Sequence, residues 1–254
     1  MELTEYWFEQ AINALRSGEL TKAACFLEHY KNDLLQLEPH SYFEFGRYPI
    51  FNTGYPANYR IVVPIFWEVL ERNENRILAI SKNSLLWEMF GSNKTGEPRT
   101  DWQITDWAHS LAREMLNSSL INTWFSDEER SLICPTPILY ERMVSDHKII
   151  AKLDDRLFFL STEEIESYYK GADRSSLILF SDHDGKDAFR VWAENSPYWT
   201  RSLGEPECGI TSVVIVDENG RFDKTRFDSD EIGWRPAMWI DTSRLDKLIP
   251  SGQS

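Results

Sequence analysis

The chain has 254 residues, with 27 Lys and Arg against 41 Asp and Glu, so its formal net charge is −14. Nucleic acids and anionic membranes are bound mainly through clustered basic residues, and no basic stripe is present, which argues against both partners. No apolar run approaches the roughly 20 residues of a membrane-spanning helix.

The three cysteines, Cys25, Cys134 and Cys208, are widely spaced and form no Cys-x-x-Cys pair. The acidic N-terminus lacks the basic and apolar segments of a signal peptide, so we expect a cytoplasmic protein with reduced thiols. The five histidines show no metal-binding spacing, and Asp182–Asp187 resembles a calcium loop without its closing acidic residue. We therefore expect neither a metal ion nor a cofactor.

Residues 1–38 predict a helical hairpin. Apolar residues recur at helical spacing in two segments, Gly18 separates them as a helix C-cap would, and Pro39 ends the second. Two short helices cannot bury an apolar stripe by themselves, so we expect it to pack on the rest of the chain, with a second copy of the chain as the alternative. The stripe comprises Trp7, Ala11, Ala14, Leu15, Leu27 and Leu34.

The next segment is rich in glycine and proline, and we interpret residues 40–64 as an irregular lead-in loop. Two apolar runs follow, Pro64–Glu71 and Arg76–Ser81, around the polar tetrapeptide Arg-Asn-Glu-Asn. This pattern predicts a β-hairpin.

The middle of the chain predicts three helices. The first begins near Thr105 or Asp106, where apolar residues again recur at helical spacing. The second and third begin after Ser126 and Ser161, because each serine is followed three positions later by a glutamate, as in a capping box. We expect a strand at Arg156–Leu160 to lead into the third helix.

The final third of the chain is rich in β-forming residues. Thr211–Val216 and Arg221-Phe222 flank an Asn-Gly turn and predict a hairpin. Trp234–Ile240 predicts one closing strand, and we expect the polar tail after Asp241 to be loosely held.

Two segments in this region each place an arginine beside tryptophan, namely Tyr198–Gly204 and Gly233–Ile240. Together with the segments above, in the same order, they resemble a bacterial domain family of unknown function. Members of that family carry Trp-Trp-Leu-Arg-Ser-Pro-Gly and Gly-Val-Arg-Pro-Ala-Leu-Trp-Leu stretches. Here Tyr198, Leu203 and Trp234 replace the family's Trp, Pro and Val, and the resemblance covers residues 43–241.

The order of segments also looks like the C-type-lectin-like fold that formylglycine-generating enzymes share. The resemblance implies an α+β domain over residues 39–244, with a twisted antiparallel sheet and flanking helices, between the helical hairpin and a polar tail at residues 245–254. Calcium-dependent sugar binding is not indicated, because Glu205-Pro206-Glu207 is present without a Trp-Asn-Asp stretch. The cysteine pair of formylglycine-generating enzymes is also missing, since Cys208 stands alone in this part of the chain.

The function that we favour from sequence is a non-catalytic recognition module. It would bind a protein or a small ligand through a loop face built from residues 171–197, 203–210 and 224–232. An enzyme using the same face is one alternative. The other is a structural subunit that assembles through the N-terminal helices as a homo-oligomer.

The candidate binding residues are Trp199, Arg201, Trp234 and Arg235, since arginine beside tryptophan suits an anionic or aromatic ligand. The structural alternative is that both arginines are buried and paired with carboxylates, because a buried charge requires a partner. Glu163 and Glu164 are then the candidate partners.

Overall fold

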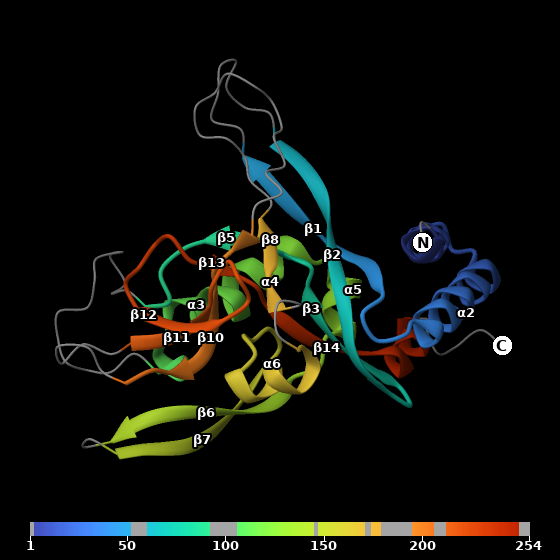
Figure 1. The fold of residues 1–254 in the computed structure, drawn as a ribbon. Coiled ribbons are helices and arrows are strands. Elements are labelled where there is room, and N and C mark those ends of the chain that lie inside the picture. Colours follow the sequence, from blue (N-terminus) through green and yellow to red (C-terminus); the bar gives the residue numbers. More distant parts are fainter. Residues whose placement is uncertain are drawn as a thin grey trace.

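A computed structural model describes residues 3–51, 60–91, 106–144, 147–170, 174–178, 195–205 and 212–248 (Figure 1). These residues form an α+β fold in which a helical hairpin precedes a curled, mostly antiparallel sheet, as the sequence predicts. None of the helices in these ranges combines the length and the apolar character that crossing a membrane requires.

The helical hairpin consists of α1 (Leu3–Arg16) and α2 (Leu20–Gln36), which confirms the prediction. Gly18 between them has a φ of 78°, a left-handed conformation that glycine adopts without steric cost. The facing sides of the helices are buried and belong to the main core. The buried side chains include Phe8, Ala11 and Ile12 of α1 and Leu27, Tyr30 and Leu34 of α2.

The hairpin packs on its own chain, as expected. Helix α1 contacts β1 (Tyr42–Phe51), and α2 contacts the 3-10 helix η4 (Thr242–Leu248) near the C-terminus. Ion pairs join Arg47 to Glu9 at 2.6 Å and Lys31 to Asp246 at 3.1 Å. The helices and the sheet therefore share one core.

The prediction of a loosely held tail after Asp241 is wrong for Thr242–Leu248. Leu245 is fully buried, and Leu248 packs against the core. A spacing of three residues brings side chains onto the same face of a 3-10 helix, so these two leucines cover the core together.

The first sheet is antiparallel, with strand order β1-β2-β3-β14. It contains, beside β1, the strands β2 (Arg60–Asn73), β3 (Arg76–Ser81) and β14 (Ala237–Asp241). The predicted hairpin around the Arg-Asn-Glu-Asn segment is the β2–β3 pair.

The predicted lead-in loop over residues 40–64 is wrong, because most of its described residues pair as β1 and the start of β2. Proline is tolerated where no ladder hydrogen bond is needed: Pro49 lies on the edge strand, and Pro64 precedes the part of β2 that pairs with β3. Gly46 lies at a bulge with a φ of 79°, tightly against Phe125.

The second sheet has strand order β12-β11-β10-β13-β5. The predicted hairpin with the Asn-Gly turn is confirmed as the β11–β12 pair, with Gly220 at a φ of 75°. The strands are β5 (Leu86–Trp87), β10 (Tyr198–Leu203), β11 (Ser212–Val216), β12 (Phe222–Arg226) and β13 (Gly233–Trp234).

The single closing strand predicted at Trp234–Ile240 is wrong. Gly233 and Trp234 belong to the second sheet, whereas Ala237–Asp241 belongs to the first. The chain crosses between the sheets at Arg235-Pro236, where proline has no N–H to donate to a ladder. This crossover fixes Arg235 between the two sheets.

The helices start where the sequence predicts. Asp106 caps the 3-10 helix η1 (Trp107–His109), which leads through α3 (Leu111–Met115) and the π-helix η2 (Leu116–Leu120) into α4 (Ile121–Trp124). Both capping boxes are present, at the starts of α5 (Asp127–Leu132) and α6 (Thr162–Tyr168).

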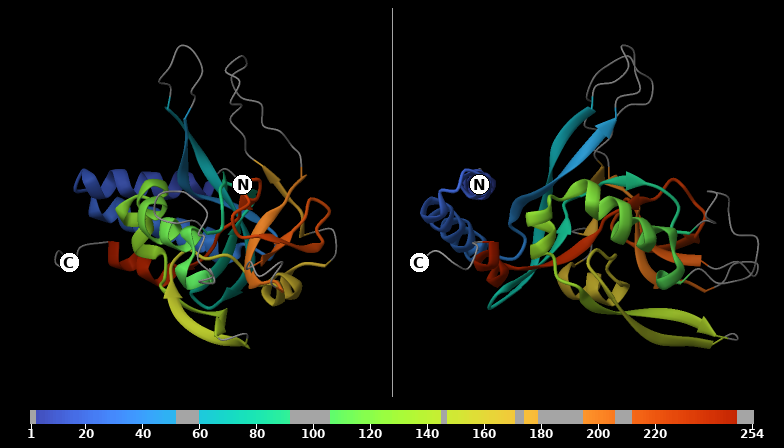
Figure 2. Two further views of the ribbon diagram at one scale, coloured as in Figure 1. Left: turned by 90° about the vertical axis from the view of Figure 1, so that its left-hand side faces the viewer. Right: turned by 180° about the vertical axis from the view of Figure 1, so that it is seen from behind.

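Arg156–Leu160 is not the predicted strand. The chain bends at Arg156 and Leu157 and then forms one isolated bridge, from Phe158 to Ala237. The nearby strands β6 (Thr136–Val144) and β7 (His147–Asp155) form a hairpin that no sequence pattern had indicated. The remaining strands, β4 (Asn83–Ser84), β8 (Ser176–Ile178) and β9 (Asn195–Ser196), form a small sheet. Figure 2 shows the β1–β2 and β6–β7 hairpins projecting from opposite sides of the body.

Candidate functional site

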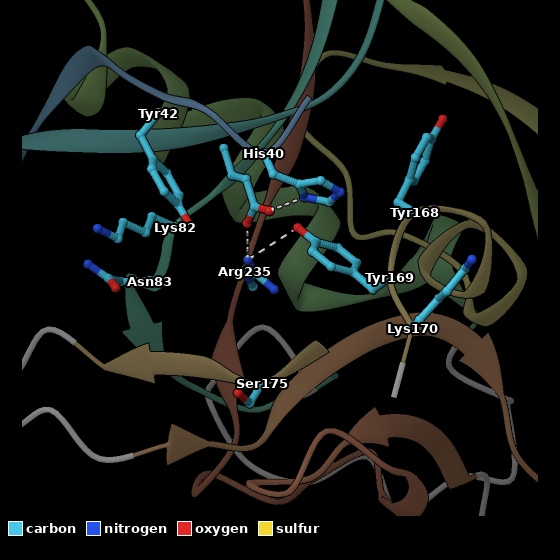
Figure 3. Close-up of a pocket in the computed structure, with 10 residues that line it drawn as sticks. His40, Tyr42, Lys82, Asn83, Tyr168, Tyr169, Lys170, Ser175 and Arg235 are labelled. Atoms are coloured by element: carbon cyan, nitrogen blue, oxygen red, sulfur yellow. Dashed lines mark hydrogen bonds and ion pairs between the residues drawn. The ribbon is translucent and has the colours of Figure 1, made fainter. Parts of the chain in front are cut away.

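A cavity of about 560 Å³ lies between the first sheet and the end of α6 (Figure 3). Its wall combines phenol rings, basic side chains and one carboxylate. The lining residues are His40, Tyr42, Glu68, Lys82, Asn83, Tyr168, Tyr169, Lys170, Ser175 and Arg235.

Arg235 forms the floor of this cavity, and its position follows from the crossover between the sheets. The residue is 3% exposed, its Nε donates to the carbonyl of Ser81 at 2.8 Å, and its Nη2 donates to Oε2 of Glu68 at 3.1 Å. Burial acts to lower the pKa of the guanidinium, but Tyr169, Tyr198 and Glu68 together raise it above its ordinary value. Arg235 is therefore a permanent cation.

Glu68 links Arg235 to the cavity rim. It lies on β2 between buried apolar residues and is only 5% exposed. While Oε2 accepts from Arg235, Oε1 is 2.7 Å from Nδ1 of His40. Both carboxylate oxygens thus have a partner, which a buried charge requires.

His40 has a strained backbone. Its φ of 65° is in the left-handed region, which costs a residue with a side chain about 1–2 kcal/mol. A backbone hydrogen bond of 2.7 Å to the carbonyl of Val69 holds this turn in place. The imidazole packs against Tyr169, with ring centres 5.5 Å apart, and Glu68 occupies Nδ1. Among the described residues, Nε2 has no hydrogen-bond partner.

The phenols of the cavity remain protonated at neutral pH. Burial raises the pKa of both Tyr42 and Tyr169, and the charge of Glu68 adds to the effect. Burial and a hydrogen bond of 2.6 Å to Glu71 raise the pKa of Tyr168. The cavity therefore offers apolar ring surface together with neutral hydroxyl groups.

Two lysines stand on opposite sides of the cavity, with Tyr169 and Arg235 between them (Figure 3). Nζ of Lys82 lies 4.4 Å from the centre of the Tyr42 ring, a cation–π contact. Within the described parts of the chain, neither Lys82 nor Lys170 pairs with a carboxylate. Because Arg235 and Glu68 neutralise each other, the cavity keeps an excess of positive charge in a strongly acidic chain.

Arg201, the second predicted arginine, lies elsewhere. It is 2% exposed, its guanidinium forms a two-pronged pair with Glu164 at the start of α6, and its Nε donates to the carbonyl of Leu139 at 2.8 Å. It lines a separate groove of about 500 Å³ under β6. The predicted partner Glu164 is confirmed, whereas the partner of Arg235 is Glu68 and was missed.

Both predicted tryptophans are buried rather than in a cavity wall. Trp199 and Trp234 are 1% and 0% exposed, and their indole N–H groups both donate to the carbonyl of Glu88, at 3.0 and 2.8 Å. The structure thus brings the two tryptophans together and separates the two arginines.

Much of the predicted loop face lies outside the described residues, including 171–173, 179–194 and 206–210, and with them Asp182–Asp187 and Cys208. In the ranges that are described, no three His, Cys, Asp or Glu side chains are grouped to hold a metal ion.

Several cavity residues had not been selected from sequence. Glu68 offered a signal, because a carboxylate interrupts the apolar run of β2, and such an isolated charge in a strand core requires a buried partner. His40, Lys82 and Lys170 offered none, since each is an ordinary polar residue beside a turn or an element end.

The chain belongs to the family described as a domain of unknown function (DUF6273), which matches residues 74–242. This confirms the predicted membership of a domain family of unknown function. No curated protein and no solved structure matches the chain. The matched range includes Lys82, Lys170 and Arg235, whereas His40 and Glu68 come from the segment before it. The cavity is therefore lined both by residues within the matched range and by residues before it.

Proposed function

We propose that the protein is a non-catalytic recognition module that binds a small anionic ligand in the cavity around Arg235. The observation that carries the proposal is the excess positive charge of this cavity, where Lys82 and Lys170 have no carboxylate partner among the described residues while the chain as a whole has a net charge of −14. The acidic remainder of the molecule would repel an anion, so a local positive cavity favours a specific site.

The size and rigidity of the cavity support the same proposal. A volume of about 560 Å³ is in the range of small-molecule sites, which span roughly 300–1,000 Å³. The hydrogen bonds of Glu68 to His40 and Arg235 hold the floor in place before any ligand arrives. The recognition surface is then this cavity rather than the loop face.

Two further features belong to the proposal. A C-type-lectin-like arrangement is supported by the curled antiparallel sheet and by α6, which precedes the strands β10 to β13 of the second sheet in the chain. A cytoplasmic location is supported by the free thiols of Cys25 and Cys134.

The test is isothermal titration calorimetry of the full chain with acetate, phosphate and sulfate, and with ammonium and guanidinium as cationic controls. We expect the anions to bind and the cations not to bind. The double variant Lys82→Met/Lys170→Met should weaken anion binding about tenfold or more, whereas Lys152→Met, an exposed lysine of β7 outside the cavity lining, should change nothing. Equal affinities for the wild type and the double variant would overturn the proposal.

Acid–base catalysis is a second candidate, favoured by the pair of His40 and Glu68. A carboxylate on Nδ1 orients the imidazole and leaves Nε2 as the atom that can accept or donate a proton. Strained backbone, such as the φ of His40, is also found at functional sites.

The two candidates are separated by following a bound ligand by NMR. An unchanged ligand after prolonged incubation supports recognition. Chemical conversion that disappears in His40→Gln, while binding persists, supports an enzyme. Assembly through the N-terminal helices has less support, because their apolar faces pack on β1 and η4 of the same chain.

A further inference from the structure

We propose that the ligand of this cavity carries two anionic groups, one at each end of a short uncharged spacer, and that Lys82 and Lys170 bind one group each. The inference rests on the proposed function and specifies the class of its ligand. It follows from the placement of the charges in the cavity.

The two lysines come from different elements. Lys82 directly follows β3, and Lys170 follows α6, and the two residues line opposite sides of the cavity (Figure 3). Neither has a carboxylate partner among the described residues. A ligand with one compact anionic group would neutralise one lysine and leave the other without a counter-charge.

The centre of the cavity does not suit an anion. Arg235 already neutralises Glu68, and both oxygens of Glu68 are occupied, one by Arg235 and one by His40. An anion placed there would face the carboxylate of Glu68 without a free positive charge to offset the repulsion.

An uncharged spacer fits the same centre. The ring of Tyr169 lies between the two lysines and that of Tyr42 lies beside Lys82 (Figure 3), and their raised pKa values keep both phenols neutral. Aromatic rings present apolar surface, and hydroxyl groups at their tips can donate hydrogen bonds. The cavity thus alternates a cation, a neutral aromatic centre and a second cation.

Lys82 is also held in position for binding. Its backbone N–H donates to the carbonyl of Phe66 at 2.8 Å, and its ammonium group rests on the Tyr42 ring. Asn83 lies beside it and brings an amide to the same side of the cavity (Figure 3). A carboxylate or a phosphate could accept from both groups, because the lysine ammonium binds either anion as a point charge.

The experiment is isothermal titration calorimetry of the full chain with two matched series. One series contains the dicarboxylates succinate, glutarate, adipate and pimelate with their monocarboxylate counterparts, and the other contains alkyl bisphosphates with alkyl monophosphates. We expect one spacer length in at least one series to bind about tenfold tighter than its monoanionic counterpart, because a second charge-assisted contact is formed. The series that binds more tightly identifies the anionic group.

Single variants test the two contacts. Lys82→Met and Lys170→Met should each reduce the affinity for the best dianion to that of its monoanionic counterpart, and Lys152→Met should leave it unchanged. Circular dichroism and thermal melting show whether each variant is folded, and Lys→Gln replacements at the same positions serve if a methionine variant is not.

The outcomes are distinguishable. If dianions and monoanions bind with equal affinity, the two-anion inference is overturned while anion recognition stands. If only one lysine affects the dianion, the inference is overturned as well. If no compound of either series binds, both the inference and the proposed function fail.

Discussion

Arg201 and Arg235 occupy similar places in the sequence and different places in the molecule. Each follows a tryptophan within two positions, is nearly fully buried and pairs with a glutamate. The side chain of Glu164, which pairs with Arg201, is 36% exposed, whereas that of Glu68, which pairs with Arg235, is 7% exposed. Water can therefore solvate the first carboxylate if its arginine is lost, but not the second.

The two tryptophans beside these arginines, in contrast, lie close together in the molecule. Trp199 and Trp234 converge on one backbone carbonyl, that of Glu88, in the aromatic core. The same residue pattern therefore has different roles at its two positions. The tryptophans join the parts of the core, Arg201 fastens α6 to β10, and Arg235 forms the floor of a cavity.

Replacement of Arg235 should have the largest effect. Arg235→Met leaves the buried charge of Glu68 without its cation, and we expect the free energy of unfolding to fall by about 3–5 kcal/mol. Urea denaturation monitored by tryptophan fluorescence measures this loss of unfolding free energy. The double variant Arg235→Met/Glu68→Leu, which removes both charges, should recover much of the loss. If Arg235→Met alone is as stable as the wild type, the burial of Glu68 does not make Arg235 more important for stability than Arg201.

Arg201→Met should cost less, about 2–3 kcal/mol. The carbonyls of Leu139 and Phe159 lose their donor, but Glu164 can be solvated. The same denaturation experiment gives the ranking. If Arg201→Met lowers the free energy of unfolding more than Arg235→Met does, the exposure of the partner carboxylate does not determine the loss of stability.

The shared carbonyl of Glu88 predicts coupling between the tryptophans. Either single variant, Trp199→Phe or Trp234→Phe, leaves one indole donor on that carbonyl, whereas the double variant leaves none. The double variant should therefore lose about 1–2 kcal/mol more than the two single losses combined. A double-mutant cycle of unfolding free energies measures this coupling, and additive losses would show that the carbonyl does not link the two strands.

His40 should give the smallest change. His40→Ala and His40→Gly both lose the contact with Glu68, but glycine also removes the steric cost of the φ of 65°. We expect His40→Gly to be more stable than His40→Ala by about 1 kcal/mol. Thermal melts of the two variants, with wild type as the reference, provide the check, and equal stabilities would argue against backbone strain at this rim of the cavity.

Where sequence prediction succeeded, the interactions are local. Ser126 and Ser161 each bond a backbone N–H three positions away, so each capping box could be identified from four consecutive residues. The Asn-Gly turn and Gly18 are equally local, because they depend on the φ of one residue. The pairing of Arg201 with Glu164 was found because a family resemblance supplied the order of the segments.

Prediction failed where distant segments decide the outcome. Residues 40–64 contain glycine and proline and resemble a loop, yet much of this segment forms β1 and the start of β2. The sheet tolerates the prolines because Pro49 lies on the edge strand and Pro64 precedes the part of β2 that pairs with β3. The prediction of a single strand at Trp234–Ile240 failed for the same reason. Its first residue pairs in the second sheet, whereas its last four residues pair in the first sheet.

The sequence by itself determined the α+β class, the helical hairpin, the helix starts and the membership of a domain family, since each depends on residue pattern and short-range hydrogen bonding. The sequence also singled out Arg235, but the tertiary structure decided which residues surround it in the candidate site. Glu68 and Arg235 are 167 positions apart, and they meet because β2 and the crossover at Arg235-Pro236 lie in one fold. The apolar run around Glu68 indicates a buried charge, but it does not identify the partner, because the partner lies on a distant segment that also excludes the solvent.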